Sequence, residues 1–449
     1  MLSIILFKEG NLMAKKLFPA LLLIFSAFSA SLFAGDLTWD LCVNEALKNS
    51  LSLISAREIL NQARAASWMP VSSALPQISA SASGSKSGNE PGVDATPTIL
   101  NGISYNPANT YDENYSYGLT AKQLIFDGFD NTQQILKASE DLKAAELNYK
   151  IASSQVRYNL KQSYANLMKA QRMVVITGQI YDLRTKQYGD LKLRYGAGTE
   201  NKGDLMYSEA DMEQAKFEQD QAVRDLELAK LDFGNKLGRD KTDDIVLKED
   251  FTTTENSDKD PDFDALMKTN YSQLLAAAQV RSAGYALGST ISSMLPTAYL
   301  DGSLGRGGSE LMPQNTQWSF GVDISFSIFD GGKSAAQTAQ ASAALSQAKA
   351  DEKSSDQQAL YTLENSWNAF KDAVLTLAVQ NNYLIADQER AKIADAQYTT
   401  GLIVFNDWTI IQDSLVSAQK SFVAAQAQLL ISEAAWVQAK GGTLEDDIR

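Results

Sequence analysis

The sequence predicts an α+β membrane protein with an internal two-fold repeat, in which β-strands lead into very long helices. The first observation is a corner motif that occurs twice, as Phe126-Asp127-Gly128 and Phe329-Asp330-Gly331. The two copies lie 203 residues apart (329 − 126 = 203). The second observation is a long proline-free run after each corner, with apolar residues at seven-residue spacing. The third is an alternation of apolar and polar residues before each corner, which is the period of a β-strand.

Aspartate and glycine at each corner suit a sharp turn from strand to helix. An aspartate can accept hydrogen bonds from the free N–H groups of a helix N-terminus, and glycine tolerates a tight backbone. The offset of 203 also relates the strands and helices on either side, as the pairs Tyr115 with Trp318 and Leu160 with Leu363 illustrate. Chance periodicity would not keep one offset through strand, corner and helix, so we interpret the chain as a duplicated fold.

Composition excludes several classes of function. The chain has 449 residues, a formal net charge of −14, no histidine and one cysteine, Cys42. The acidic balance argues against a nucleic-acid-binding surface. Without histidine or paired cysteines, the chain lacks the side chains for histidine-based catalysis and for the usual zinc and haem sites. We therefore expect neither an enzyme nor a bound cofactor or metal.

The N-terminus has the layout of a secretory signal peptide over residues 1–35. Lys15 and Lys16 precede the apolar run Leu17–Phe28 and the small-residue patch Ser29–Gly35. Met13 would give a conventional start for such a signal. The sequence after the signal contains no apolar run of about 18 residues, so an exported chain of this kind would cross a membrane as β-strands.

The first predicted repeat, residues 36–238, contains two strands framed by helices. Its first elements are a helix over 37–74 with a kink at Pro70, a strand over 77–86, a polar loop over 87–114 and a strand that ends at the corner. The run from Phe129 to Tyr195 then predicts one helix of 67 residues (195 − 129 + 1 = 67), which would be about 100 Å long. Gly198 interrupts it, and a helix over 204–238 completes a hairpin.

Residues 239–261 lack periodicity and are expected to form a linker or equatorial segment. The second repeat, residues 262–443, follows the same plan, and residues 444–449 form a C-terminal tail. Its elements are a helix over 262–294, a strand that opens at Pro296, a strand over 318–329, and helices over 333–398 and 408–440. Matching lengths predict four equal helical columns, two of them continuous. In the other two, short helices stack end to end, 204–238 with 262–294 and 408–440 with 37–74.

Four strands per chain cannot close a barrel that spans a bilayer, because transmembrane barrels have at least about eight strands. An open sheet edge is not tolerated in hydrocarbon, so several chains must share one barrel. The strand over 318–329 is long enough to cross, and Tyr115, Tyr117 and Trp318 suit an aromatic girdle at the interface. The plainer alternative, an edge hairpin on a soluble helical protein, does not explain a regular apolar face beside an export signal.

The ordered set of strands, Phe-Asp-Gly corners, long helices and Tyr-x-x-Gly helix breaks resembles TolC-like outer-membrane efflux proteins, from about Leu37 to Thr443. The resemblance implies a homotrimer with a 12-stranded β-barrel, four strands from each chain, in the outer membrane of a Gram-negative bacterium. A long α-helical barrel would continue it through the periplasm. The outer-membrane lipid, a periplasmic adaptor protein and an inner-membrane transporter would be its partners, with no nucleic acid.

Two functions are compatible with this resemblance. The first expectation is a passive exit duct of a tripartite efflux system for small molecules. The alternative is the exit duct of a type I protein secretion system, which uses the same architecture. An exported coiled-coil structural protein or adhesin, a different class, would explain the heptads but not the paired strands.

By the same resemblance, the two helix breaks would form a periplasmic tip, about 100 Å from the barrel. In the family this tip is the gate, and its glycine-containing turns dock onto the adaptor. The corresponding turns of this chain are Gly198-Thr199 and Gly401-Leu402. The two Phe-Asp-Gly corners would join barrel strand to tunnel helix, which is a structural role.

Asp204 and Asp407 are the candidate acidic residues of the gate, because each lies six residues after a tip glycine. By resemblance, Tyr398 would hydrogen-bond Asp204 and help to hold the tip closed. The alternative role of both aspartates is to cap a helix N-terminus, and it is stronger for Asp204. Ile403 and Ile410 stand where the family has an arginine and a second acidic residue, so the charged latch is only partly present.

Overall fold

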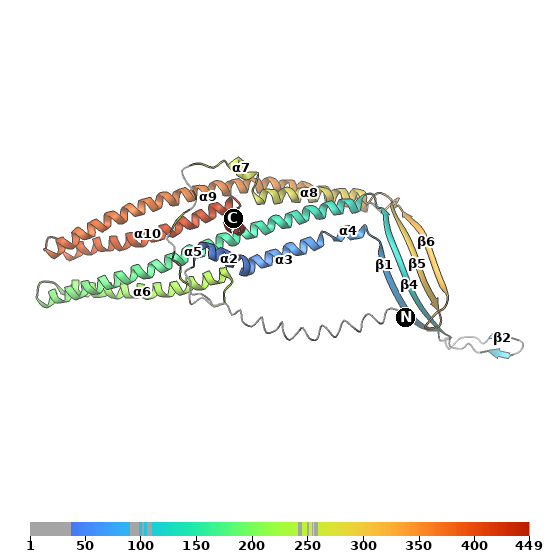
Figure 1. Ribbon diagram of the computed structural model, residues 1–449, viewed down its shortest axis with the longest axis horizontal. Helices are drawn as coiled ribbons and strands as arrows, with labels where there is room; N and C mark the ends of the chain where they lie inside the picture. Colours follow the sequence, from blue (N-terminus) through green and yellow to red (C-terminus); the bar gives the residue numbers. More distant parts are fainter. Residues whose placement is uncertain are drawn as a thin grey trace, which may run out of the picture.

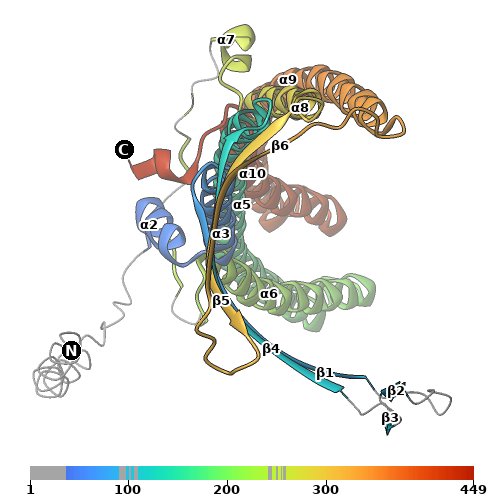
Figure 2. The ribbon, with the colours of Figure 1, turned by 90° about the vertical axis from the view of Figure 1, so that its right-hand side faces the viewer.

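The computed structural model describes residues 37–89, 98–100, 103–105, 110–240, 245–248, 251–253, 255 and 259–448. Within them, long helices run along an elongated molecule that carries a β-sheet at one end (Figure 1). Seen end-on, the sheet and the helices follow one open arc (Figure 2). The predicted signal peptide, residues 1–35, lies outside the described residues. Among the described helices, none combines the length and the apolar character that a bilayer crossing requires.

Two continuous helices of 67 residues extend along the molecule, and each forms an antiparallel hairpin with the shorter helix that follows it. The two hairpins are α5 (Asp130–Gly196) with α6 (Lys202–Leu237), and α9 (Lys333–Thr399) with α10 (Phe405–Ala439). Apolar residues at heptad spacing give each long helix a buried stripe, so that Leu160 on α5 and Leu363 on α9 are fully buried. Both long helices begin and end within one residue of the predicted positions.

The short helices stack differently from the prediction. They are α2 (Trp39–Asn49), α3 (Leu51–Ala66), α4 (Met69–Ser73), α7 (Phe263–Met267) and α8 (Tyr271–Ser292). After α6, Gly238 packs against the backbone of Asn49, the last residue of α2 and two residues before α3 begins. After α10, the side chain of Asn270 donates to the Ala439 carbonyl at 3.3 Å. Thus α3 lies beyond the end of α6, and α8 lies beyond the end of α10 (Figure 1). Contacts between the helix ends, rather than matching helix lengths, determine which short helices stack end to end.

Two segments predicted as single helices are divided. Residues 37–74 form α2, α3 and α4, because Ser50 has an extended backbone that separates the first two. Pro70 lies in the first turn of α4, where its missing N–H costs no helical hydrogen bond. Residues 262–294 divide before α8, because the Asn270 side-chain oxygen accepts hydrogen bonds from the N–H groups of Ser272 and Gln273 and thereby starts a new helix.

The main sheet is antiparallel, with the order β1-β4-β5-β6. Its strands are β1 (Gln77–Asn89), β4 (Thr110–Phe126), β5 (Thr297–Gly308) and β6 (Thr316–Ser325). A separate hairpin pairs β2 (Thr98–Leu100) with β3 (Ile103–Tyr105). The predicted loop over 87–114 is therefore partly strand, since backbone pairing from Asn89 to Thr110 does not require apolar side chains. The last strand ends at Ser325, earlier than predicted.

Strand register gives the sheet two chemically different faces. Leu304 lies opposite both Leu119 and Trp318, so apolar side chains share one face. On β6 these apolar side chains are largely exposed: Trp318, Phe320, Val322 and Ile324. Hydroxyl pairs share the other face, at 2.6 Å for Ser79 with Thr120 and 2.8 Å for Ser303 with Ser319. One face therefore suits hydrocarbon, and the other suits water.

The C-terminal residues 444–448 are tied into the core. Leu444, at the start of η1 (Leu444–Ile448), is fully buried, and its N–H donates to the Ser153 hydroxyl at 3.1 Å. The Asp447 carboxylate accepts hydrogen bonds from Arg157 Nε at 2.9 and 3.0 Å and from Trp39 Nε1 at 3.1 Å. Asp447 therefore joins α2 to α5 at mid-length of the molecule.

We expect Asp447→Asn to lower the free energy of unfolding by about 2 kcal/mol, the usual value of hydrogen bonds to a charged group. The reason is that the Arg157 side chain, 12% exposed, loses the charge that balances it. Denaturant unfolding followed by helical circular dichroism measures the effect. The control is Lys392→Gln, because Lys392 and Glu389 are exposed and 4.0 Å apart. It should cost less than about 0.5 kcal/mol, and equal losses would contradict the account.

Candidate functional site

The two helical hairpins end at the same end of the molecule, opposite the sheet (Figure 1). Gly198 and Gly401 lie in the two turns with φ of 76° and 75°, a left-handed conformation that favours glycine. The next residue in each turn donates its N–H back to the helix, Thr199 to the Arg194 carbonyl at 3.0 Å and Leu402 to the Gln397 carbonyl at 2.8 Å. Both long helices thus end in the glycine-stopped geometry that their sequences predict.

Tyr398 joins the two turns. Its hydroxyl donates to Glu200 Oε1 at 3.0 Å, across from the α9 hairpin to the α5 hairpin. Its ring stacks on Trp408 with centroids 4.7 Å apart, and the Arg194 guanidinium lies 4.9 Å from the ring centroid. Burial, together with the hydrogen bond to Glu200, raises the pKa of Tyr398 to about 12. The hydroxyl therefore remains a donor throughout the ordinary pH range.

The predicted hydrogen bond between Tyr398 and Asp204 is wrong. Asp204 lies in the first turn of α6, where its carboxylate accepts from the Asn201 side-chain amide at 2.6 Å. Its own N–H donates to the Asn201 side-chain oxygen at 2.9 Å, which completes a reciprocal helix cap. Glu200 lies in the turn itself and takes the place of Asp204 beside Tyr398. The spacing of six residues from the tip glycine selected Asp204 and so missed Glu200.

A small hydrophobic core packs against Tyr398. Leu191 of α5 packs there with Ala394 of α9 and with Trp408 of α10, next to the rings of Tyr398 and Phe405. The Asp395 carboxylate accepts hydrogen bonds from Trp408 Nε1 at 2.7 Å and from Gln412 Nε2 at 2.8 Å. No sequence motif pointed to Asp395, because its two donors lie 13 and 17 residues away on another helix.

Asp407 differs from Asp204 in its surroundings. It lies in the first turn of α10 with an exposed side chain, and among the described residues no group hydrogen-bonds or ion-pairs with its carboxylate. The residue before this helix, Val404, has no side-chain oxygen that could cap it. The negative charge of Asp407 therefore stabilises the N-terminus of α10 through the helix dipole, and its carboxylate remains exposed to solvent.

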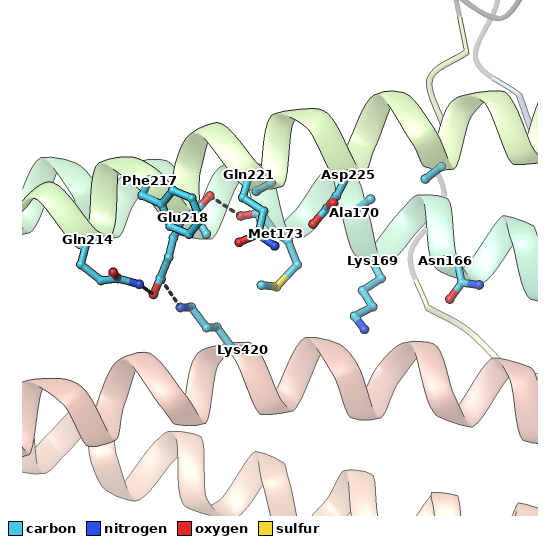
Figure 3. Close-up of a pocket in the computed structure, with 13 residues that line it drawn as sticks. Asn166, Lys169, Ala170, Met173, Gln214, Phe217, Glu218, Gln221, Asp225 and Lys420 are labelled. Carbon is cyan, nitrogen blue, oxygen red and sulfur yellow. Dashed lines mark hydrogen bonds and ion pairs between the residues drawn. The ribbon is translucent and has the colours of Figure 1, made fainter.

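Charged side chains also connect the hairpins farther from the tip. Lys420 on α10 donates to Glu218 on α6 at 2.5 Å, at the end of a groove of about 530 Å³ (Figure 3). Burial acts to raise the pKa of Glu218, but hydrogen bonds from Lys420 and Gln214 hold it below the ordinary value. Arg184 on α5, 6% exposed, forms an ion pair with Asp413 on α10. Heptad spacing marks these residues as helix-face charges but does not reveal their partners.

The two strand–helix corners have the same backbone and different packing. Asp127 accepts from the Asn131 N–H at 2.7 Å, and Asp330 accepts from the Ser334 N–H at 2.8 Å, so both cap the following helix. Gly128 and Gly331 both have φ of 70°. A side chain at Gly128 would meet the Ser292 carbonyl oxygen at 2.5 Å, whereas Gly331 has open space around it.

The phenylalanines show the same difference in packing, because Phe126 of the first corner contacts another ring and Phe329 of the second is exposed. The Phe126 ring contacts the Phe129 ring edge-on, with centroids 5.6 Å apart. Phe329 is 87% exposed. The second corner therefore lies at the open end of the arc, without a neighbour from its own described chain.

Comparison with known proteins identifies the chain. The family model described as "Outer membrane efflux protein" matches residues 42–233 and 268–442. The chain belongs to the outer membrane efflux protein family. A curated relative, outer membrane efflux protein BepC of Brucella suis, is 21% identical over 361 residues, which cover 77% of each chain. This efflux protein therefore lies in the outer membrane, with its helical part in the periplasm, and belongs to a family of efflux proteins rather than enzymes.

Solved structures share the fold. The CmeC outer membrane channel of Campylobacter jejuni is 19% identical with a TM-score of 0.77, over 90% of this chain and 85% of that chain. The MtrE outer membrane channel of Neisseria gonorrhoeae, in an open state, is 20% identical with a TM-score of 0.77, over 94% of both chains. VceC of Vibrio cholerae is 19% identical with a TM-score of 0.76, over 90% of this chain and 96% of that chain. Family membership thus favours an efflux duct over an exported coiled-coil fibre.

Proposed function

We propose that this efflux protein is the passive exit duct of a tripartite system that exports small molecules. The observation that carries the proposal is the curved sheet (Figure 2), whose strand register gives it one apolar face and one hydroxyl-bearing face. Among the described strands, β1 and β6 each have one unpaired edge. Hydrocarbon does not tolerate free strand edges, so copies of the chain pair β6 with β1. Three copies would give a 12-stranded barrel above a helical barrel of the same symmetry.

The two repeats, residues 36–238 and 262–443, then form one third of the duct. We assign residues 239–261, which the structure describes only in part, to an equatorial belt. The helices α2 and α7 and the C-terminal residues lie on the convex side of the arc (Figure 2), where a belt would surround the tunnel. The concave side, which the hydroxyl-bearing face of the sheet would continue, becomes the conduit.

The hairpin tips supply the gate and the docking surface. Tyr398 closes the tip through Glu200, while Asp407 presents its charge at the mouth. The turns Gly198-Thr199 and Gly401-Leu402 would bind a periplasmic adaptor, with Leu402 75% exposed as an apolar contact. The adaptor would connect the duct to an inner-membrane transporter, which supplies the energy for export.

Single-channel recording tests the assignment of Asp407. We expect Asp407→Asn to lower the preference for cations over anions by roughly three- to tenfold, because three copies of this carboxylate concentrate negative potential in one narrow mouth. Asp204→Asn is the matched control, since its side chain serves the cap of α6 and an asparagine can still cap. Unchanged selectivity in Asp407→Asn, or an equal change in the control, would remove Asp407 from the gate.

A further inference from the structure

One arginine lies on the apolar face of the sheet. Arg306 on β5 is opposite Tyr117 on β4 and Thr316 on β6. Side chains alternate along a strand, so Arg306 shares its face with Leu304 two residues before it. Leu304 in turn lies opposite Trp318, on the face that meets lipid. The guanidinium of Arg306 is therefore on the lipid-facing side of the barrel wall.

Arg306 lies near the outer end of β5. From Ala298, beside the strand–helix corner, to Arg306 is eight residues (306 − 298 = 8), which is about 26 Å along the strand and about 20 Å of height at the usual strand tilt. The helices lie in the periplasm, so the opposite end of the strand is the outer end. A charge on the lipid face is costly at mid-membrane but tolerated near the interface. Tyr117 and Trp318 beside it are the residue types that mark this interface.

Among the residues that the structure describes on this face, Arg306 differs from Lys86 in having no counter-ion. Lys86 on β1 forms an ion pair with Glu113 at 2.7 Å. Among the described residues, by contrast, no carboxylate pairs with Arg306, and its side chain is exposed. A guanidinium at a lipid interface presents several donors in a fixed plane, which fit a phosphate group. Thr316, opposite Arg306, adds a hydroxyl on the same face.

A hollow for an apolar chain adjoins this guanidinium. A surface cavity of about 400 Å³ is lined by Arg306, Thr316, Tyr117, Leu119, Leu304 and Ala80. The Tyr117 hydroxyl donates to the Leu311 carbonyl at 2.7 Å, which folds the β5–β6 loop toward this face. Leu311 and Met312 in that loop are exposed. The site thus combines a cation, a hydroxyl and an apolar floor.

We propose that Arg306 binds the phosphate of an outer-leaflet glycolipid of the lipid A type, whose acyl chains lie along the apolar face below it. The phosphate accepts hydrogen bonds from the guanidinium and from Thr316, and the acyl chains contact Leu304 and Leu119. A phosphorylated glycolipid is the occupant because it forms the outer leaflet of this membrane, at the level where Arg306 lies. The proposal rests on the outer-membrane location and not on the identity of the exported molecule.

Lipid retention measured by native mass spectrometry tests the proposal. The full protein is reconstituted in nanodiscs of neutral phosphatidylcholine with added lipid A, dephosphorylated lipid A or phosphatidylglycerol. We expect the wild-type protein to retain lipid A at least about tenfold better than its dephosphorylated form, the usual effect of a charge-assisted hydrogen bond. Equal retention of the two lipid A forms, or better retention of phosphatidylglycerol, would overturn the proposal without any variant.

Substitutions then locate the site. Arg306→Gln should reduce lipid A retention about tenfold, and Arg306→Lys should retain part of it, because a lysine keeps the charge but loses the planar donors. The control is Lys122→Gln. Lys122 lies on the opposite face of the sheet, 3.9 Å from the Tyr299 ring centroid. Lys122→Gln should therefore leave lipid A retention unchanged. Full retention in Arg306→Gln, or equal loss in both glutamine variants, would contradict the assignment.

Discussion

Replacing Gly128 by alanine should destabilise the protein by about 3 kcal/mol, whereas the same change at Gly331 should cost about 1 kcal/mol. Both glycines have φ of 70°, so both substitutions carry the strain of a left-handed backbone. At Gly128 the new methyl group would also lie 2.5 Å from the Ser292 carbonyl oxygen and 2.6 Å from Leu295 Cβ. Those atoms belong to the last residue of α8 and to the segment that leads from α8 to β5, so this part of the chain would have to move away from the corner.

Thermal or denaturant unfolding, followed by circular dichroism, measures both variants. Gly331→Ala is the matched control, because it occupies the repeat-related position and has no atom within 4 Å of the new methyl group. Gly128→Ala should lower the free energy of unfolding clearly more than Gly331→Ala does. Equal destabilisation would show that backbone strain alone governs the corner and that packing against Ser292 does not.

Replacing Tyr398 by alanine should favour the open tip by roughly a hundredfold. The substitution removes the ring stacked on Trp408 and the hydrogen bond to Glu200, a loss of about 3 kcal/mol for a large, partly buried aromatic side chain. Tyr398→Phe keeps the ring and removes the hydrogen bond, so it should favour opening by about tenfold. Open probability and conductance in planar bilayers distinguish the three proteins.

The same tyrosine predicts a pH dependence. Its pKa is raised from 10.0 to about 12, so the folded tip stabilises the neutral hydroxyl. The stabilisation is complete below the ordinary value and is lost as pH rises through about 12. Wild-type conductance should therefore show no Tyr398-dependent opening between about pH 5 and 9. If the wild-type channel opened within this pH range and Tyr398→Phe did not, the role given to this hydroxyl would be contradicted.

The long helices were predictable because their signal is long and uninterrupted. A proline-free run spans each of α5 and α9, apolar residues such as Leu160 and Leu363 recur at heptad spacing within it, and glycines stop both helices. The stacking of the short helices was not predictable from length. Which helix end meets which depends on contacts such as Gly238 with Asn49, and these connect residues far apart in the sequence.

The candidate site was predictable only in its location. The tip glycines followed from the helix breaks, but the partner of Tyr398 depends on side-chain direction within a turn. The Asn201 amide donates to the Asp204 carboxylate, whereas the Tyr398 hydroxyl donates to Glu200. Likewise, Arg306 is one of many charges in the sequence, and strand register alone places it on the apolar face. Spacing along a chain cannot specify either contact.

The most direct test of the duct is to purify the full-length protein in detergent, measure its mass, and record it in planar bilayers. Three copies sharing one barrel predict a heat-resistant particle of three chains that forms channels of stable conductance. The unpaired edges of β1 and β6 would have to be paired in lipid, which such an assembly would achieve. A folded single chain in detergent, or a three-chain particle that forms no channel, would contradict the account.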